Sequence, residues 1–78
     1  MDEYVVVVFP DDREVNLDHR PYGRTNHILK VETGTHAFDL GTPRNYRPAS
    51  QTRQVVDTDL AHPLEVIFEK KSRKARVR

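Results

Sequence analysis

Histidine and aspartate are the residue types in this 78-residue chain that most readily bind metals or move protons. No three histidines have the spacing of a shared zinc site, and the aspartates lack the spacing of a calcium loop. The aspartates stand instead where turns favour them, because their side chains bond to nearby backbone. We therefore expect no metal site and no cofactor. The residues concerned are His19, His27, His36 and His62, and Asp11, Asp12, Asp18, Asp57 and Asp59.

Nucleophilic chemistry lacks the residues that it needs. The chain has no cysteine, and its two serines, Ser50 and Ser72, lie in a proline-rich segment and in a basic carboxyl-terminal segment. Neither serine has a patterned base beside it. The three glycines are scattered over residues 23–41 and cannot form a phosphate-cradling loop. We therefore expect a protein that is not an enzyme.

Charge is divided unevenly along the chain. Residues 1–69 carry 7 Lys and Arg against 12 Asp and Glu, a net charge of −5, whereas residues 70–78 carry six basic residues and no acidic one. Such a segment can bind phosphates by charge, with strong salt dependence and without sequence preference. The alternatives are a solvated linker or a tail that lies on its own acidic body. The candidate phosphate-binding residues are Lys70, Lys71, Arg73, Lys74, Arg76 and Arg78.

Arginine and tyrosine recur together in two segments that contain prolines. We expect the loops at residues 21–26 and 43–48 to lie near each other, which would form a surface that binds a protein or a polyanion. The alternative is an ordinary wet surface with scattered aromatic residues. The candidate partner-binding residues are Arg20, Tyr22, Arg24, Arg44, Tyr46 and Arg47.

Apolar residues occur in short runs with the period of β-strands. Residues 3–9 form a β-branched and aromatic run that ends at a proline, typical of a strand that lies along a core. Residues 13–18 alternate, with Val15 and Leu17 directed inward. Residues 64–70 alternate as well, except at Ile67, which indicates a partly covered outer face.

Residues 27–32 and 35–40 have the pattern of a β-hairpin with a two-residue loop. This register places Leu29 opposite Phe38, and most of the large apolar side chains then share one face. A three-residue loop would exchange the two faces, because a slip of one residue inverts burial along a strand. The burial pattern therefore predicts the two-residue loop.

The fold expected from these runs is all-β. Six or seven short strands with turn signals every 6–12 residues, and no amphipathic helix, predict a small antiparallel β-sandwich. Residues 1–69 form its single domain, and residues 70–78 are expected to be a disordered basic tail. The amino-terminal run is too short for a signal peptide or a membrane span. We expect a cytoplasmic location if Met1 is the native start, and an envelope or extracellular one if the chain was cut from a larger protein.

The order of the turn motifs resembles the PEGA domain family. Pro10 fits the first position of its Pro-Glu-Gly-Ala turn, and Asp11 is a close substitute for the second, while Asp12 and Arg13 depart from Gly-Ala. Residues 23–25 (Gly-Arg-Thr) and 34–36 (Gly-Thr-His) fit two further turns, although Asn replaces Pro at position 26. Asn45-Tyr46 matches the Gly-Tyr before the last strands. The resemblance implies a compact β-sandwich used as an accessory, interaction or envelope-associated module, without catalytic or cofactor residues.

The function expected first is a non-catalytic PEGA-like module that binds an unknown protein partner through an exposed sheet edge or the Arg/Tyr loops. One alternative is a small nucleic-acid-binding protein that contacts phosphates through the basic tail. The other is a homodimeric structural module, because Ile67 and the all-valine first strand indicate a subunit edge. The chain is accordingly expected to be a monomer or a weak homodimer.

Overall fold

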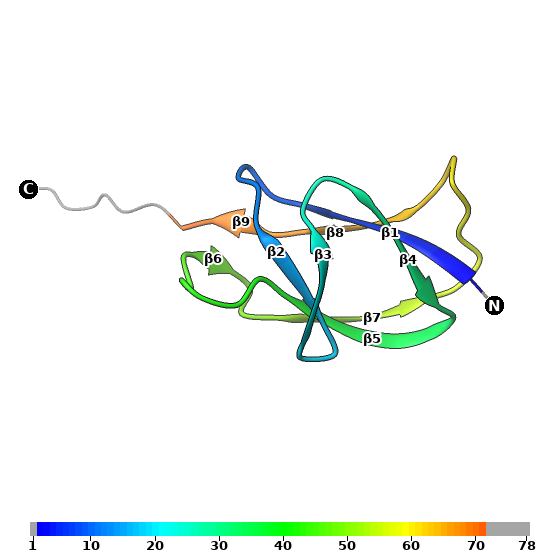
Figure 1. Cartoon of the computed structure of the whole chain (residues 1–78), viewed down its shortest axis with the longest axis horizontal. Helices are drawn as coiled ribbons and strands as arrows, with labels where there is room; N and C mark the ends of the chain where they lie inside the picture. The colour runs from blue at the N-terminus through cyan, green and yellow to red at the C-terminus, as the bar shows by residue number, and fades with distance from the viewer. Residues whose placement is uncertain (1, 72–78) are drawn as a thin grey trace, which may run out of the picture.

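The computed structural model describes residues 2–71, which form nine β-strands in three sheets and no helix (Figure 1). The all-β class predicted from the sequence is confirmed. Two of the nine strands have only two residues, which explains why the strand count exceeds the six or seven expected. The strands are β1 (Asp2–Val8), β2 (Glu14–Leu17), β3 (Arg20–Arg24), β4 (Ile28–Glu32), β5 (Gly34–Asp39), β6 (Tyr46–Arg47), β7 (Gln51–Val55), β8 (Leu64–Ile67) and β9 (Glu69–Lys70).

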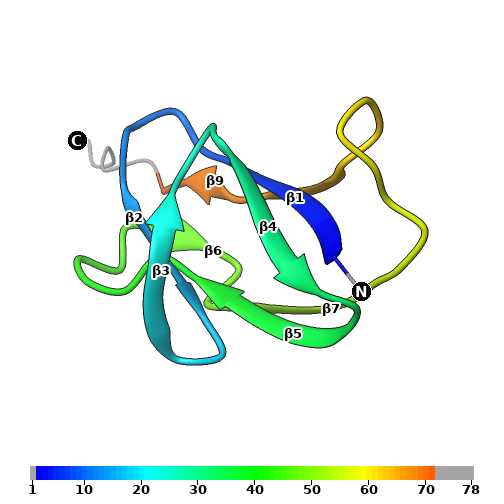
Figure 2. The same ribbon diagram turned by 45° about the vertical axis from the view of Figure 1, so that its right-hand side comes forward.

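Two sheets face each other across the core. The first sheet has the strand order β4-β1-β8, the second has the order β3-β2-β5-β7, and the short pair β6-β9 continues at one end (Figures 1 and 2). All pairs are antiparallel except β1 and β8, which run parallel with Val5 opposite Leu64 and Val7 opposite Val66. The expected purely antiparallel arrangement is therefore wrong at one pair. Between β1 and β8 the chain passes through the second sheet, and parallel neighbours need a long connection of this kind.

Strand β1 lies at the centre of the first sheet and supplies much of the core. Its odd-numbered residues are buried, as is Phe9 directly after it, and Val5 and Val7 are completely inaccessible to solvent. The even-numbered valines point to the opposite face and are only half-buried. This alternation of burial is not visible in the sequence, because valines occupy both faces. Val15, Phe38 and Val55 of the second sheet fill the core from the other side.

The predicted hairpin of residues 27–40 does not form. β4 pairs with β1, whereas β5 pairs with β2 and β7, and the chain passes from the first sheet to the second at Gly34, whose φ is +140°. The predicted burial of Leu29 and Phe38 is nevertheless confirmed. Two strands on facing sheets bury the same alternate residues as two strands of one hairpin, so the burial pattern does not specify the pairing.

The sequence pattern predicted a turn at Gly23, but this residue lies inside β3. A Cβ atom at this position would stand 2.4 Å from Leu29 Cδ2, so the absence of a side chain lets β3 approach β4. Next to it, the register between β2 and β3 shifts by one residue: Val15 is opposite Gly23, and Asn16 is opposite Pro21. Tyr22 is thus the extra residue of a β-bulge, which can redirect a side chain.

The ordered body extends further than the expected boundary at residue 69. Lys70 belongs to β9, and the backbone N–H of Lys71 donates to the carbonyl oxygen of Asn45 at 2.9 Å. The rest of the predicted tail, residues 72–78, lies outside the described part of the chain. Among residues 2–71, no helix has the length and apolar character needed to cross a membrane.

Candidate functional site

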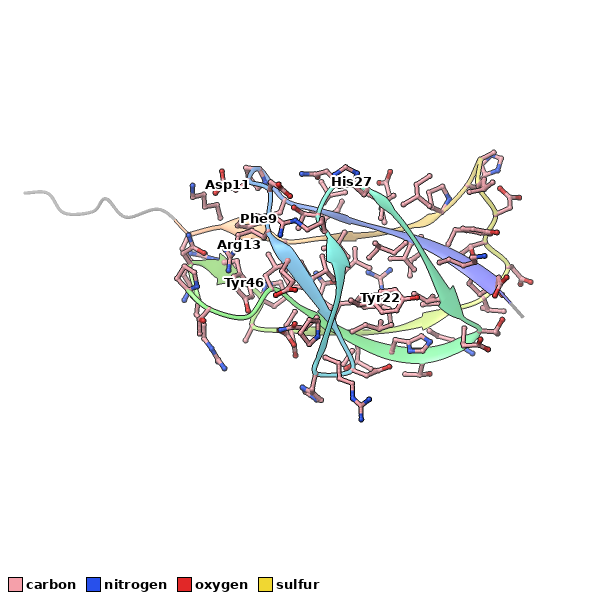
Figure 3. All side chains as sticks on the ribbon, in the orientation of Figure 1. Phe9, Asp11, Arg13, Tyr22, His27 and Tyr46 are labelled. Carbon is pink, nitrogen blue, oxygen red and sulfur yellow. The ribbon has the colours of Figure 1, made fainter. Side chains whose placement is uncertain are left out.

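Tyr46 was predicted to be a surface residue for partner binding, and this prediction is wrong. Its side chain is only 4% exposed and lies near Phe9 (Figure 3), with an edge-to-face contact at a centroid distance of 6.3 Å. A second edge-to-face contact, at 5.5 Å, is with Phe68. Its hydroxyl donates to the carbonyl oxygen of Gly41 at 2.9 Å. Tyr46 therefore fixes the long loop to the core, as an aromatic ring with a polar tip often does.

The side chains predicted on β3 contact this chain's own body. The Tyr22 hydroxyl donates to the carbonyl oxygen of Lys30 on β4. Arg24 forms an ion pair with Asp12 at 3.0 Å, and this guanidinium lowers the pKa of the Asp12 carboxyl group. Arg20 is exposed. Within residues 2–71, no hydrogen bond or ion pair joins β3 to the loop at residues 43–48, and the combined Arg/Tyr surface stays a prediction.

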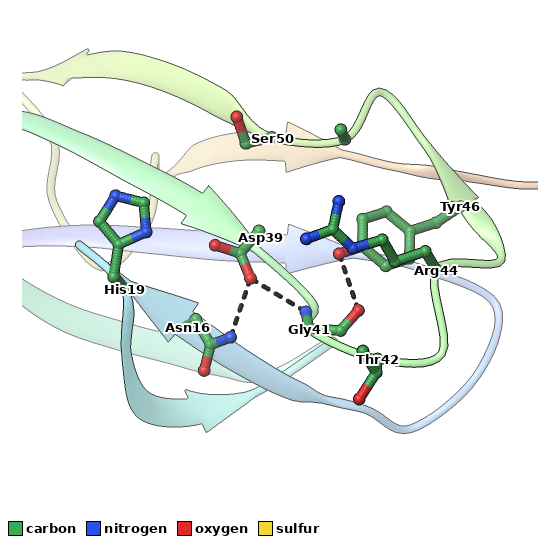
Figure 4. A pocket seen from close by; sticks show the side chains of 9 residues that line it. Asn16, His19, Asp39, Gly41, Thr42, Arg44, Tyr46 and Ser50 are labelled. Carbon is green, nitrogen blue, oxygen red and sulfur yellow. Dashed lines mark hydrogen bonds between the residues drawn. The ribbon is translucent and has the colours of Figure 1, made fainter.

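Arg44 lies in a polar hollow of about 360 Å³ that also contains His19, on the opposite side of Asp39 (Figure 4). One oxygen of Asp39 accepts hydrogen bonds from the Asn16 amide at 2.8 Å and from the backbone N–H of Gly41 at 2.9 Å. These bonds tie β2 to the start of the long loop. The central polar group of the hollow is thus already engaged in holding the fold.

The cations predicted to bind phosphate have two different positions. Lys70 forms an ion pair with Asp11 at 2.7 Å, and the exposed Lys71 follows it at the end of the described residues. The other four, Arg73, Lys74, Arg76 and Arg78, lie outside them. Phosphate binding by this segment therefore stays a prediction.

No group of three or more His, Asp or Glu side chains within residues 2–71 is arranged to hold a metal ion. His36 has Asp18 at 2.7 Å from Nδ1 and the carbonyl oxygen of Glu32 at 2.7 Å from Nε2. Because both nitrogens face acceptors, chiefly Asp18, the pKa of His36 is raised. This histidine links the Asp18 turn to the crossover from β4 to β5.

Glu3 is a buried carboxylate that the sequence analysis did not single out. It accepts hydrogen bonds from the hydroxyl groups of Thr58 and Thr33 and from the backbone N–H of Thr58. These bonds, with that from the Thr58 hydroxyl first, lower the pKa of Glu3 to about 2. The available signal was its position: Glu3 has the same parity as Val5 and Val7, so it belongs to the buried face.

Arg13 is a second residue that the sequence did not identify as important. Its guanidinium donates to the Asn45 side chain at 2.8 Å and to the carbonyl oxygens of Leu40 and Pro43 at 3.1 and 2.9 Å. It also lies 5.6 Å from the ring centroid of Tyr46 (Figure 3). Arg13 therefore anchors the long loop that leads into β6.

The position of β6 reveals an unusual edge on β8. Phe68 donates its backbone N–H to Val8 of β1, so the even-numbered residues of β8 direct their backbone groups toward β1. Because backbone groups alternate along a strand, Glu65 and Ile67 direct theirs away from β1. Residues 69 and 71 share this parity, and there β6 pairs with the chain. β6 thus covers one half of the edge, and no strand of residues 2–71 pairs with the half at Glu65 and Ile67.

Pro48 marks the point at which the chain leaves this edge. Continuing the β6–β9 ladder from Arg47 opposite Glu69 would place Ala49 opposite Ile67. The chain turns away at Pro48 instead, and no residue of β6 takes this place. Only the Gln51 side-chain amide returns, donating to the carbonyl oxygen of Ile67 at 2.7 Å. A side chain thus occupies a place that a strand would normally take.

An open hollow of about 530 Å³ adjoins the uncovered half of the edge, and it is lined by Arg47, Pro48, Ile67 and Glu69. Ile67 is a large aliphatic residue at the end of β8, and its side chain is 54% exposed. The combination of open backbone groups, an exposed aliphatic side chain and an adjoining hollow makes this region the candidate site. We call it the β8 edge and define it by Glu65, Ile67 and the hollow.

Comparison with known proteins gives no family or relative for this chain: no family model, no curated protein and no solved structure matches it.

Proposed function

We propose that this chain is a non-catalytic protein-binding module that accepts an extended segment of a partner protein at the β8 edge. The observation that carries the proposal is the half-covered edge: β6 and the preceding Asn45 lie opposite residues 69–71, while the backbone groups of Glu65 and Ile67 point outward without a strand beside them. Addition of a strand to such an edge is a recurring mode of peptide recognition, in which main-chain hydrogen bonds supply the affinity.

The opposite edge of the same sheet supports this choice. On β4, the outward carbonyl oxygen of Lys30 already accepts a hydrogen bond from Tyr22, and the lysine side chain itself is exposed there. Lysine and covering side chains are common protections of an edge strand against further pairing. On β8 the corresponding position is Ile67, which is apolar and exposed.

The turn motifs support a further proposal, that the module is PEGA-like. Gly34 has a φ of +140° at the crossover between the sheets, and Asn26 has a φ of +65° in the turn that follows β3. Glycine and asparagine are the residues that adopt such backbone conformations most readily. The proposal concerns the class of module, and the β8 edge supplies its binding mode.

A matched pair of proline variants tests the binding proposal. Ile67→Pro and Lys30→Pro each remove one outward N–H from an edge strand of the first sheet, and neither removes a hydrogen bond to β1. Peptides selected from a random display library against the full chain serve as probes. We expect Ile67→Pro to weaken binding about tenfold or more, and Lys30→Pro to change it less than about twofold.

Two results would contradict the proposal: selected peptides that bind both variants as well as the wild type, or a loss of binding that is specific to Lys30→Pro. Circular dichroism must show that each variant is folded. If Ile67→Pro is unfolded, Gln51→Ala provides the second test. That change frees the Ile67 carbonyl oxygen, so it is expected to leave peptide binding equal or stronger.

A further inference from the structure

The side chains at the β8 edge define the chemistry of the partner segment, on the assumption that the proposed strand addition is correct. Leu64, Val66 and Phe68 face the core, so Glu65 and Ile67 face outward on the same side of the first sheet. Side chains directly opposite each other on one face of an antiparallel pair interact. Two positions of a partner strand, two residues apart, would therefore lie beside these two side chains.

Glu65 is a carboxylate without a cation. It is exposed, and no ion pair involves it within residues 2–71. A second carboxylate, Glu69, lines the adjoining hollow together with one cation, Arg47, which lies opposite it in the β6–β9 ladder. Residues 1–69 carry a net charge of −5, so the surroundings add to the negative field. A lysine or arginine opposite Glu65 would gain a cross-strand ion pair, whereas an acidic residue would be repelled.

Ile67 requires a different neighbour. Its exposed side chain and the ring of Pro48 give the hollow an apolar lining next to the strand position. Aliphatic and aromatic side chains form the more favourable cross-strand pairs with a β-branched residue, and they would also remove this apolar surface from water. The position opposite Ile67 is therefore suited to an aliphatic or aromatic residue.

The direction of the partner follows from β6. This strand runs antiparallel to β9 on the same edge, and a partner that continues its line would run antiparallel to β8. The residue opposite Ile67 then precedes the residue opposite Glu65. We propose that the β8 edge selects an extended segment with an apolar residue followed, two positions later, by lysine or arginine.

Two synthetic peptides test this preference, Thr-Ile-Thr-Lys-Thr and Thr-Ile-Thr-Glu-Thr, both acetylated and amidated. Amide chemical-shift titrations of the full chain measure their affinities at low salt. The lysine peptide is expected to bind about five- to tenfold more tightly than the glutamate peptide. In the Glu65→Lys variant this preference is expected to reverse. Because Glu65 is exposed and outside the core, the variant is expected to remain folded.

The possible failures are distinguishable. Equal binding of the two peptides, with loss in Ile67→Pro, would overturn the charge preference and leave strand addition intact. A lysine preference that persists in Glu65→Lys would place the acidic determinant elsewhere and also overturn it. Binding of neither peptide, nor of any library-selected peptide, would overturn both proposals. Sedimentation in which the free chain dimerises, and Ile67→Pro abolishes the dimer, would make a second copy the occupant and overturn the proposed segment.

Discussion

The two sides of the sandwich are built differently, and the difference indicates where a partner binds. On the side of β3 and β4, Gly23 permits a close approach to Leu29, and Tyr22 bonds across to Lys30. On the side of β7 and β8, the Gln51 side-chain amide bonds to the Ile67 carbonyl oxygen. The first side is closed by packing and by a side-chain hydrogen bond to β4, whereas on the second side the backbone groups of Glu65 and Ile67 face outward and, within residues 2–71, only the Ile67 carbonyl oxygen is bonded.

Truncation of one aliphatic residue on each side should give the largest contrast. Leu29 is 8% exposed and Ile67 is 54% exposed. Leu29→Ala removes buried atoms and leaves a cavity, so it is expected to lower the free energy of unfolding by about 2–5 kcal/mol. Ile67→Ala is expected to change it by less than about 0.5 kcal/mol. Urea denaturation measures both, and similar losses would show that the β8 edge is part of the core.

Filling the close approach on the β3–β4 side should give the next largest effect. The Cβ atom of Gly23→Ala would clash with Leu29 Cδ2, which must move within a buried site. Overpacking of this kind costs about 1–3 kcal/mol. The double variant with Leu29→Val provides the control, since it makes room for the new methyl group. Strictly additive losses in the double-mutant cycle would contradict the proposed contact.

The side-chain hydrogen bonds of Tyr22 and Gln51, one on each side of the sandwich, should differ by a smaller amount. Tyr22→Phe removes the donor to the Lys30 carbonyl oxygen and is expected to cost about 0.5–1.5 kcal/mol. Gln51→Ala leaves an exposed carbonyl oxygen that water can reach, and its cost is expected to be below about 0.5 kcal/mol. Thermal unfolding followed by circular dichroism compares the two variants. A larger loss of stability in Gln51→Ala than in Tyr22→Phe would contradict this order. It would show that the Gln51 hydrogen bond holds β7 and β8 together.

Acid should lower the free energy of unfolding by protonating Glu3, which bonds to Thr33 beside the crossover from β4 to β5. The pKa of Glu3 is about 2 in the folded chain, below its ordinary value of 4.5. A depressed folded pKa stabilises the protein above the unfolded value, and the stabilisation is lost as pH falls from 4.5 toward 2. Glu3→Gln is expected to reduce the slope of unfolding free energy against pH in this range. An unchanged slope would show that other carboxylates, such as Asp18, account for it.

The sequence predicted burial well because strand parity is a local property. Val15, Leu29 and Phe38 all face the core as their alternation indicated. Strand pairing was not predictable in the same way, since parity does not identify the neighbour, and β4 and β5 went to different sheets. The parallel pairing of β8 with β1 likewise depends on a crossover that no local pattern specifies.

The candidate site was harder to predict than the fold. Tyr46 follows an irregular, proline-containing segment and has no alternating neighbours, so nothing local indicated that the ring is buried. The β8 edge depends on where β6 stops, which follows from the tertiary position of Arg47 and Pro48. Only the outward position of Ile67 was visible beforehand, because this residue breaks the alternation of its strand. The sequence indicated a partly covered face there, whereas the side chain is 54% exposed.

Amide hydrogen exchange in the presence of the lysine peptide tests the central claim most directly. Strand addition at the β8 edge would place the backbone N–H groups of Glu65 and Ile67 in hydrogen bonds that the free chain lacks. We predict that exchange at these two amides slows on binding, while exchange at Lys30 on the opposite edge stays unchanged. Protection at Lys30, or binding without protection of Glu65 and Ile67, would contradict the assignment of the β8 edge as the binding site.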